Sequence, residues 1–355
     1  MQRWSDLDAV PKGFGPSVVT IGNFDGVHRG HQAVLARLVA DARREGAAAV
    51  AITFHPHPVA VLYPDRAPAQ LIGLPDRLDL LEAAGLDAVL VMEFTPRLAA
   101  WEPERFVREV LVEALGAALV VVGRDTRFGR RNSGDVNTLR ELGKELGFAV
   151  EAIDDLGGAD EAHPSGRRWS STWARELITA GDVGTAAEAL GRLHRVIGVV
   201  VEGDHRGRGL GYPTANLSQD SSGLVPADGV YAGWLVRPAE PDADLGASTG
   251  TDVPPAPGRR LPAAISIGTN PTFDGTQRRV EAYVLDRDDL DLYGERVAVE
   301  FVRRLRPTVR FDGVDALLVQ MAADVEECRE VLGGPPKSMI TAEGRGADSA
   351  GDQPH

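Results

Sequence analysis

The first half of the chain alternates between apolar, strand-like runs and amphipathic, helix-like runs, and this alternation restricts the fold more than any other feature. The strand-like runs are 17–24, 47–54, 87–94, 117–123 and 148–154. Helical spacing of apolar residues marks 30–46, 74–85, 103–116 and 141–147, and then 171–191. Alternating strands and helices predict a Rossmann-like parallel sheet with helices on both faces. Ligands of such sheets bind beyond the carboxyl ends of the strands.

The pattern changes after residue 191, because strand-like runs now follow one another with no helix between them. They cover 196–204, 229–237, 261–269, 278–286 and 296–306, separated by Gly, Pro and Asp. This spacing is typical of an antiparallel barrel or sandwich. One helical run, 313–332, closes the chain.

Domain limits follow from this change of pattern. We expect one domain over 1–185 and a second over 186–340, with a disordered tail at 341–355. The segment 238–260 is rich in Pro, Ala, Gly and Asp and is predicted to be a surface loop of unassigned role.

Composition excludes several classes of protein. The net charge of −14 argues against a nucleic-acid binder, although a local cluster suits a small phosphorylated ligand: Arg124, Arg127, Arg130 and Arg131. The single cysteine, Cys328, rules out an intrachain disulfide or a cysteine metal site. No apolar run reaches the roughly 20 residues that span a bilayer, and residues 1–15 do not read as a signal peptide, so we expect a cytoplasmic protein without a membrane partner. Self-association is left open.

The run VTIGNFDGVHRGHQAVL (19–35) carries the clearest chemical signal. A strand ends near Gly22, a glycine-containing turn follows, and His28 and His31 lie where a helix begins. Glycines allow close approach to a phosphate, and free N–H groups at a helix start attract it. Two imidazoles three residues apart could donate hydrogen bonds to charge that develops on an α-phosphate. The competing interpretation is two surface histidines in a turn.

This run resembles the H-x-G-H nucleotidyltransferase superfamily, which transfers AMP from ATP without a covalent intermediate. Its second motif is similar to Ser170-Ser171-Thr172-Trp173-Ala174-Arg175, where hydroxyls, N–H groups and a guanidinium at a helix start would face phosphates. Taken alone, that segment could equally be a serine N-cap beside a surface arginine.

Two intervening segments, 52–64 and 121–135, resemble the FMN adenylyltransferase half of bacterial bifunctional FAD synthetases. That resemblance implies His28 and His31 as catalytic residues. The flavin-binding residues it implies are Phe54, Pro56, His57, Phe128 and Gly129. The ATP-binding residues it implies here are Gly22, Phe24, Asp25, Gly30, Asp125, Ser170, Ser171, Thr172 and Arg175. For Phe54 and Phe128, packing in the core is the competing interpretation.

The second half contains GVVVEGDHRGRGLGYPTANL (198–217), a glycine-rich stretch followed by Thr214 and Asn216. Such loops can cover phosphates, and Thr and Asn oxygens suit Mg²⁺. The stretch is similar to the signature of riboflavin kinases. The resemblance implies that Gly207, Gly209, Thr214 and Asn216 bind ATP. It also implies that Thr214 and Asn216 are ligands of Mg²⁺.

Further segments resemble the riboflavin kinases in the same order, and Glu281 occupies the position of that family's general base. Without the resemblance, a strand glutamate in a salt bridge would be the simpler interpretation. The resemblance implies a six-stranded Greek-key barrel with a terminal helix. It also implies a bifunctional enzyme that converts riboflavin to FMN, and FMN to FAD, with ATP and Mg²⁺.

Three alternatives stay open from the sequence. The first is another H-x-G-H transferase fused to an unrelated barrel, which would leave Glu281 and the Pro-Thr-Ala-Asn segment unexplained. The second is a non-enzymatic flavin-binding or nucleic-acid-binding module, against which the acidic charge and the 6% of aromatic residues count. The third is a chain with one inactive half.

Overall fold

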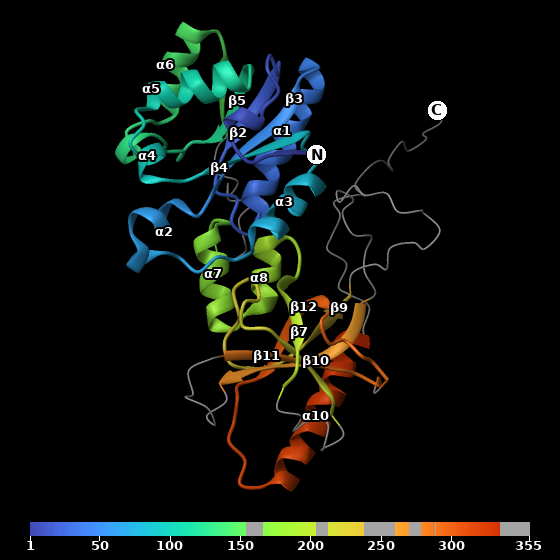
Figure 1. The fold of residues 1–355 in the computed structure, drawn as a ribbon. Coiled ribbons are helices and arrows are strands. Elements are labelled where there is room, and N and C mark those ends of the chain that lie inside the picture. The colour runs from blue at the N-terminus through green and yellow to red at the C-terminus, as the bar shows by residue number, and fades with distance from the viewer. Residues whose placement is uncertain (154–165, 204–211, 238–259, 270–277, 288, 334–355) are drawn as a thin grey trace, which may run out of the picture.

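The computed structural model describes residues 1–153, 166–203, 212–237, 260–269, 278–287 and 289–333. Within these ranges, the residues up to 190 form an α/β half and those from 191 onward form a barrel half (Figure 1). The loop expected over 238–260, apart from its last residue, lies outside the described residues, as do Gly207, Gly209 and the tail. No helix in the described part of the chain combines the length and apolar character that crossing a membrane requires.

A six-stranded sheet with parallel pairing throughout forms the centre of the α/β half, in the order β1-β4-β3-β2-β5-β6. Its strands are β1 (Gln2–Trp4), β2 (Ser17–Ile21), β3 (Ala48–His55), β4 (Ala88–Glu93), β5 (Ala117–Gly123) and β6 (Ala149–Ile153). Five of these strands coincide with the predicted runs. The sequence did not indicate β1, which is only three residues long and pairs with β4 far along the chain.

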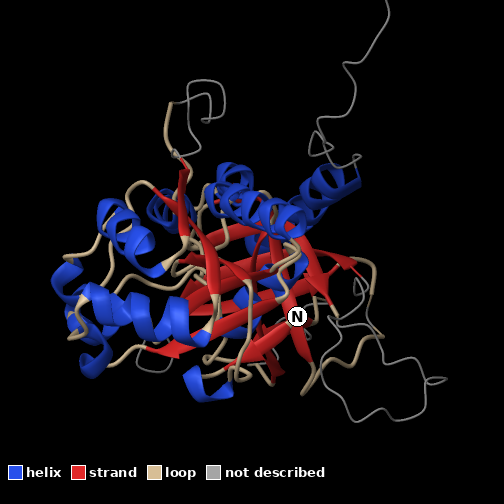
Figure 2. Ribbon diagram, turned by 90° about the horizontal axis from the view of Figure 1, so that it is seen from above, coloured by secondary structure: helices blue, strands red, loops and turns tan. Residues whose placement is uncertain are grey.

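Helices cover both faces of the sheet, as predicted (Figure 2). One face packs against α1 (Arg29–Glu45), α3 (Leu74–Ala83), α7 (Ser171–Ala180) and α8 (Val183–Leu190). The other packs against α5 (Pro103–Phe106), the π-helical η3 (Val107–Ala114) and α6 (Val136–Leu146). Val18 and Val19 of β2 are both fully buried, one in each core, because successive strand side chains point to opposite faces.

Several short helical segments lie in the connections of the α/β half. They are η1 (Leu7–Ala9), α2 (Pro58–Leu62), η2 (Pro64–Arg66), α4 (Pro96–Ala99) and η4 (Arg130–Asn132).

The barrel half is a closed antiparallel barrel in the order β10-β11-β8-β7-β12-β9, followed by α10 (Val314–Gly333). Its strands are β7 (His194–Val201), β8 (Thr214–Leu217), β9 (Gly229–Val236), β10 (Arg260–Thr269), β11 (Arg278–Val284) and β12 (Arg296–Arg306). The sixth strand, β8, contains the Thr214-Ala215-Asn216 segment, which the pattern alone showed only as the end of a glycine-rich loop. Cys328 of α10 is buried against the barrel, and burial raises the pKa of its thiol to about 12.

Helices α7 and α8 lie between the two halves (Figure 1). Ala186 and Leu190 of α8 belong to the core of the sheet, whereas Val183 belongs to the core of the barrel. The backbone N–H of Leu224 in the barrel half donates to the carbonyl of Leu71 in the α/β half, at 3.3 Å. The predicted boundary at 185/186 falls within α8, a helix whose side chains contribute to both cores.

Candidate active sites

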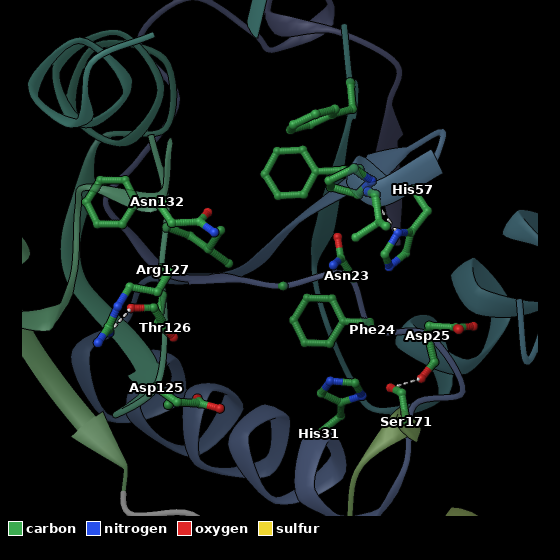
Figure 3. Close-up of a pocket in the computed structure, with 18 of the residues that line it drawn as sticks. Asn23, Phe24, Asp25, His31, His57, Asp125, Thr126, Arg127, Asn132 and Ser171 are labelled. Carbon is green, nitrogen blue, oxygen red and sulfur yellow. Dashed lines mark hydrogen bonds between the residues drawn. The ribbon is translucent and has the colours of Figure 1, made fainter. Parts of the chain in front are cut away.

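A cavity of about 1320 Å³ opens at the carboxyl ends of the parallel strands (Figure 3). Its walls include Ile21, Gly123 and Ile153, the last residues of β2, β5 and β6. The predicted site residues that line it are Gly22, Phe24, Asp25, His28, Gly30, His31, Phe54, His57, Asp125, Phe128, Gly129, Ser170, Ser171, Thr172 and Arg175. Pro56 is not part of the lining. Segments far apart in the sequence therefore meet at one cavity.

His28 and His31 stand side by side at the start of α1. His28 is the N-cap residue, and its Nδ1 accepts the backbone N–H of His31 at 3.4 Å. The two imidazoles stack, with ring centres 3.7 Å apart and planes inclined by 26°. A Cβ at Gly30 would lie 3.1 Å from Cε1 of His28 and 3.3 Å from the carbonyl oxygen of Trp169. The glycine between the histidines therefore allows the close approach of ring and backbone.

Burial keeps both imidazoles neutral near pH 7. It lowers the pKa of His28 to about 4, with a further contribution from the charge of Arg192. Burial also lowers the pKa of His31 well below its ordinary value, and the charges of His28 and Arg77 add to this effect. Because Nδ1 of neutral His28 accepts a hydrogen bond, its proton resides on Nε2. His28 can then donate one hydrogen bond to a ligand without carrying a charge.

Asp25 connects the two nucleotidyltransferase motifs. Its carboxylate is 2% exposed and accepts the backbone N–H groups of Leu71, at 3.0 and 3.2 Å, and of Ile72, at 3.4 Å. Nη2 of Arg175 donates to it at 2.9 Å, and Ser171 Oγ donates to the Asp25 carbonyl at 2.7 Å (Figure 3). The ATP-binding role of Asp25 stays a prediction. These hydrogen bonds also give Asp25 a structural role, because they join α7 and the segment before α3 to the turn after β2.

The serines and arginine of the second motif are already engaged within the protein. Ser170 Oγ caps α7 by accepting the N–H of Trp173 at 3.2 Å, and Arg175 Nε donates to the carbonyl of Ala69 at 2.7 Å. Thr172 lines the cavity beside them. The motif therefore holds the α7 end of the cavity in place, and its contacts with a phosphate stay a prediction.

Aromatic and basic side chains form another part of the lining. Phe54 packs edge-to-face on Phe94, with ring centres 5.8 Å apart, and Phe128 lies 5.8 Å from Phe106. Phe128 is 7% exposed and belongs to the sheet core, so the packing interpretation and a place in the cavity wall both hold for it. His57 caps α2, because its Nδ1 accepts the N–H of Val59 at 3.2 Å.

Some lining residues were not proposed from the sequence as site residues, although two belong to the basic cluster. Arg127 and Arg131 line the cavity, whereas Arg130 pairs with Glu102 at 2.9 Å. The remaining unproposed residues include Asn23, Tyr63, Arg66, Phe94, Trp101, Thr126, Asn132, Arg168 and Trp169. The sequence signals for these residues were the run of arginines after a strand end and the segments 52–64 and 121–135, and neither showed which side chains face the cavity.

In the barrel half, β8 and β11 bring the predicted kinase residues together. Asn216 lies directly opposite Glu281 in the antiparallel pair, and Thr214 lies opposite Tyr283. Opposite residues place their side chains on the same face, with Cβ atoms roughly 4.5–5.5 Å apart. A Cβ at Gly203 would lie 2.4 Å from Nδ2 of Asn216, so the backbone of residue 203 packs closely on this amide.

The Asn216 amide supplies an oxygen suited to a cation. Its side chain is 8% exposed, and Nδ2 donates to the carbonyl and to Oγ1 of Thr214 at 3.3 and 3.4 Å. Its Oδ1 is buried and has no hydrogen-bond partner within the described part of the chain. Mg²⁺ usually takes one or two protein oxygens together with substrate phosphates and water. Asn216 Oδ1 and Thr214 Oγ1 therefore fit the predicted metal.

Comparisons with known proteins agree with this arrangement of two sites. A protein-family model described as FAD synthetase matches residues 11–167, and one described as riboflavin kinase matches residues 190–332. The bifunctional riboflavin kinase/FMN adenylyltransferase of Escherichia coli (strain K12) is 34% identical over 316 residues, which are 89% of this chain and 93% of the relative. The protein of that name from Pseudomonas fluorescens is 37% identical over 313 residues, covering 88% and 92% of the two chains.

The chain belongs to the bifunctional riboflavin kinase/FMN adenylyltransferase family. The resemblance drawn from the sequence and the predicted fold class are thereby confirmed. A crystal structure described as a macrolide-efflux protein from Streptococcus pneumoniae has a similar fold, with a TM-score of 0.77 and 28% identity. The match covers 92% of this chain and 98% of that chain.

The two family models do not cover all of the predicted site residues of this bifunctional family member. The FAD synthetase match contains His28 and His31 but ends before Ser170, so the second motif lies between the two matches. The riboflavin kinase match begins at residue 190, at the end of α8, and contains Glu281.

Proposed function

We propose that this chain phosphorylates riboflavin to FMN in its barrel half and adenylylates FMN to FAD in its α/β half. The observation that carries the proposal is a cavity in which His28, His31 and the Ser170–Arg175 segment meet beside aromatic side chains. The opposition of Asn216 and Glu281 in the barrel supports the kinase step. We further expect a cytoplasmic enzyme, since both steps consume ATP.

For adenylylation, an oxygen of the FMN phosphate would attack the α-phosphorus of ATP. A P–O bond forms there, the bond to the bridging oxygen breaks, and pyrophosphate leaves with the electron pair. Negative charge develops on the α-phosphate oxygens, and Nε2–H of neutral His28, His31 and the N-terminus of α1 are the donors that stabilise it. Phe54 and Phe128 would pack against the flavin ring.

For phosphorylation, Glu281 would take the proton from the ribityl 5′-hydroxyl as that oxygen bonds to the γ-phosphorus of ATP and ADP leaves. Thr214 Oγ1 and Asn216 Oδ1 would hold Mg²⁺. When bound, Mg²⁺ neutralises charge on the transferred phosphate. Gly207 and Gly209, outside the described residues, stay predicted contacts of the ATP phosphates.

Incubations that start from riboflavin and from FMN test both steps of the proposal. Purified protein with riboflavin, ATP and Mg²⁺ should give FMN first and FAD afterwards, resolved by chromatography. ATP labelled at the α-phosphate should pass its label into FAD, and ATP labelled at the γ-phosphate should pass its label into FMN. Unchanged riboflavin, together with no FAD from supplied FMN, would contradict the proposal.

A further inference from the structure

Arg192 contacts the turn that leads into His28, a residue that lines the cavity of the α/β half. Arg192 follows α8 and precedes β7, within the riboflavin kinase match. Its Nη2 donates to the carbonyl of Gly26 at 2.7 Å, and its Nη1 donates to the carbonyls of Leu190 and Val27, at 3.1 and 3.4 Å. Gly26 and Val27 directly precede His28, so one guanidinium links the two halves of the chain at the catalytic turn.

The turn that Arg192 contacts is conformationally demanding. Gly26 and Val27 both have positive φ angles, 81° and 39°, and a β-branched residue rarely adopts this region. A Cβ at Gly26 would lie 2.6 Å from Cδ1 of Leu71. Gln32 supports the same turn, because its Nε2 donates to the carbonyls of Val27 and Leu190, each at 2.8 Å. Surrounding contacts must hold such a backbone in place.

The charge of Arg192 acts on His28, a residue of the cavity lining, and contributes to the lowered pKa of that imidazole. The hydrogen bonds of Arg192 within the described residues go to backbone carbonyls, and Asp76, the acid whose charge acts on it, is already paired with Arg195. Burial lowers the pKa of Arg192 to about 10, so it stays protonated near pH 7. A cation and the positive end of α1 then lie at the same turn, an arrangement that favours a bound phosphate.

We propose that Arg192 is a positioning residue for adenylylation. It holds the Gly26–Val27 turn so that His28 presents its ring to the cavity, and its charge favours binding of the nucleotide triphosphate. The inference rests on the adenylyltransferase function proposed above. It means that the α/β half needs a residue from the kinase match to complete its site.

The test compares Arg192→Met and Arg192→Lys in the full-length chain. Arg192→Met should lower kcat/KM of FAD formation from FMN by about 10–100-fold, while FMN formation from riboflavin stays within about twofold, as expected from losing a supporting contact near the reacting groups. Arg192→Lys keeps the charge and loses the planar fork of donors. Arg192→Lys should have the KM for ATP of the unchanged chain but a lowered kcat. A purely structural role would not separate KM from kcat in this way.

Arg304→Met is the matched control. Arg304 of β12 donates to the carbonyl of Ala180 in α7, at 3.4 Å, and to the carbonyl of Asp228 before β9, at 2.5 Å, and neither of these hydrogen bonds reaches the Gly26–Val27 turn. It should leave FAD formation within about twofold of the unchanged chain. Equal loss of FAD formation in Arg192→Met and Arg304→Met, or normal FAD formation in Arg192→Met, would overturn the role of Arg192. If Arg192→Met fails to fold, a normal kcat in Arg192→Lys would overturn it. No FAD from the unchanged chain would overturn the adenylyltransferase proposal itself.

Discussion

Burial determines how individual side chains act at the proposed adenylylation site. His28 and His31 have ring centres 3.7 Å apart, so two protonated imidazoles there would repel each other. Arg77 adds a third nearby group: its side chain is 1% exposed, and Nη1 donates to Thr53 Oγ1 at 3.3 Å and to the Phe54 carbonyl at 3.2 Å. The site therefore combines neutral donors with buried cations.

Replacing His31 should separate the two activities. His31→Ala removes a ring that lines the cavity, and loss of one preorganised donor costs about 10²–10³ in rate. FAD formation from FMN should fall by that factor, while FMN formation from riboflavin stays nearly unchanged in a parallel assay. His55→Ala, at an exposed histidine outside the cavity lining, serves as the control. An equal fall in both rates would contradict two separate sites.

Replacing Glu281 should have the opposite effect. Glu281→Gln keeps the size of the side chain opposite Asn216 but cannot accept the proton of the hydroxyl. Riboflavin phosphorylation should fall by about 10²–10⁴, the usual contribution of a general base. The variant should still convert supplied FMN to FAD. Near-normal FMN formation from riboflavin would remove Glu281 from the proposed mechanism.

At the level of elements, the cavity depends on how α7 is fastened to the turn after β2. The pair of Asp25 and Arg175 joins these elements across 150 residues, and the two side chains are only 2% and 18% exposed. The carboxylate also receives N–H groups from the segment before α3. Removing the carboxylate leaves groups without this partner on α7 and on the segment before α3.

Asp25→Ala should therefore lower the free energy of unfolding of the α/β half by about 3–5 kcal/mol, the cost of removing one partner of a buried ion pair. Denaturant titration followed by tryptophan fluorescence measures this quantity. Glu176→Ala is the control, because Glu176 pairs with Arg167 on the exposed side of the same helix and should contribute little. Equal effects of the two substitutions would show that the Asp25 contacts do not stabilise the fold.

On the scale of the whole molecule, α8 is shared by the two cores. Val183 is fully buried in the barrel core, and Asp182 caps the helix by accepting the N–H of Thr185 at 3.0 Å. A kinase fragment that begins at residue 186 would lose both. The domain limits of 1–185 and 186–340 stay a prediction that such fragments can test.

We expect a fragment of residues 182–340 to fold and phosphorylate riboflavin. It should be more stable than a fragment of residues 186–340 by about 1.5–3 kcal/mol, the value of burying one valine side chain. Thermal unfolding of both fragments measures the difference. Equal melting temperatures would show that Val183 contributes nothing to the isolated barrel.

Acid should destabilise the whole chain through its buried histidines. Burial lowers the pKa of His28 and of His194 to about 4, so the unfolded chain, with ordinary values near 6.5, binds these protons more readily. Their contribution to stability is complete above about pH 6.5 and is lost as the pH falls toward about 4. Melting temperatures between pH 7.5 and 4.5 should fall less steeply in His194→Gln than in the unchanged chain. An identical slope would contradict this prediction.

The sequence by itself determined the order of elements and the identity of the motifs. The apolar runs 17–24, 47–54 and 87–94 can be recognised from the local sequence. A strand buried on both faces needs apolar side chains at successive positions. His28 and His31 were proposed from a pattern of neighbours along the chain, whereas Glu281 was proposed only through the resemblance to riboflavin kinases. The short strands β1 and β8 were not recognised from the sequence pattern, because four or fewer residues are too few to show a period.

Only the tertiary structure decided which distant residues meet. Asn216 and Glu281 become cross-strand neighbours through the register of the barrel. Asp25 finds Arg175 only when α7 packs against the sheet, and Arg192 reaches the catalytic turn from beyond α8. Burial and long-range electrostatics depend on the whole fold, so neither the low pKa of His28 nor the role of Arg192 can be read from a local pattern.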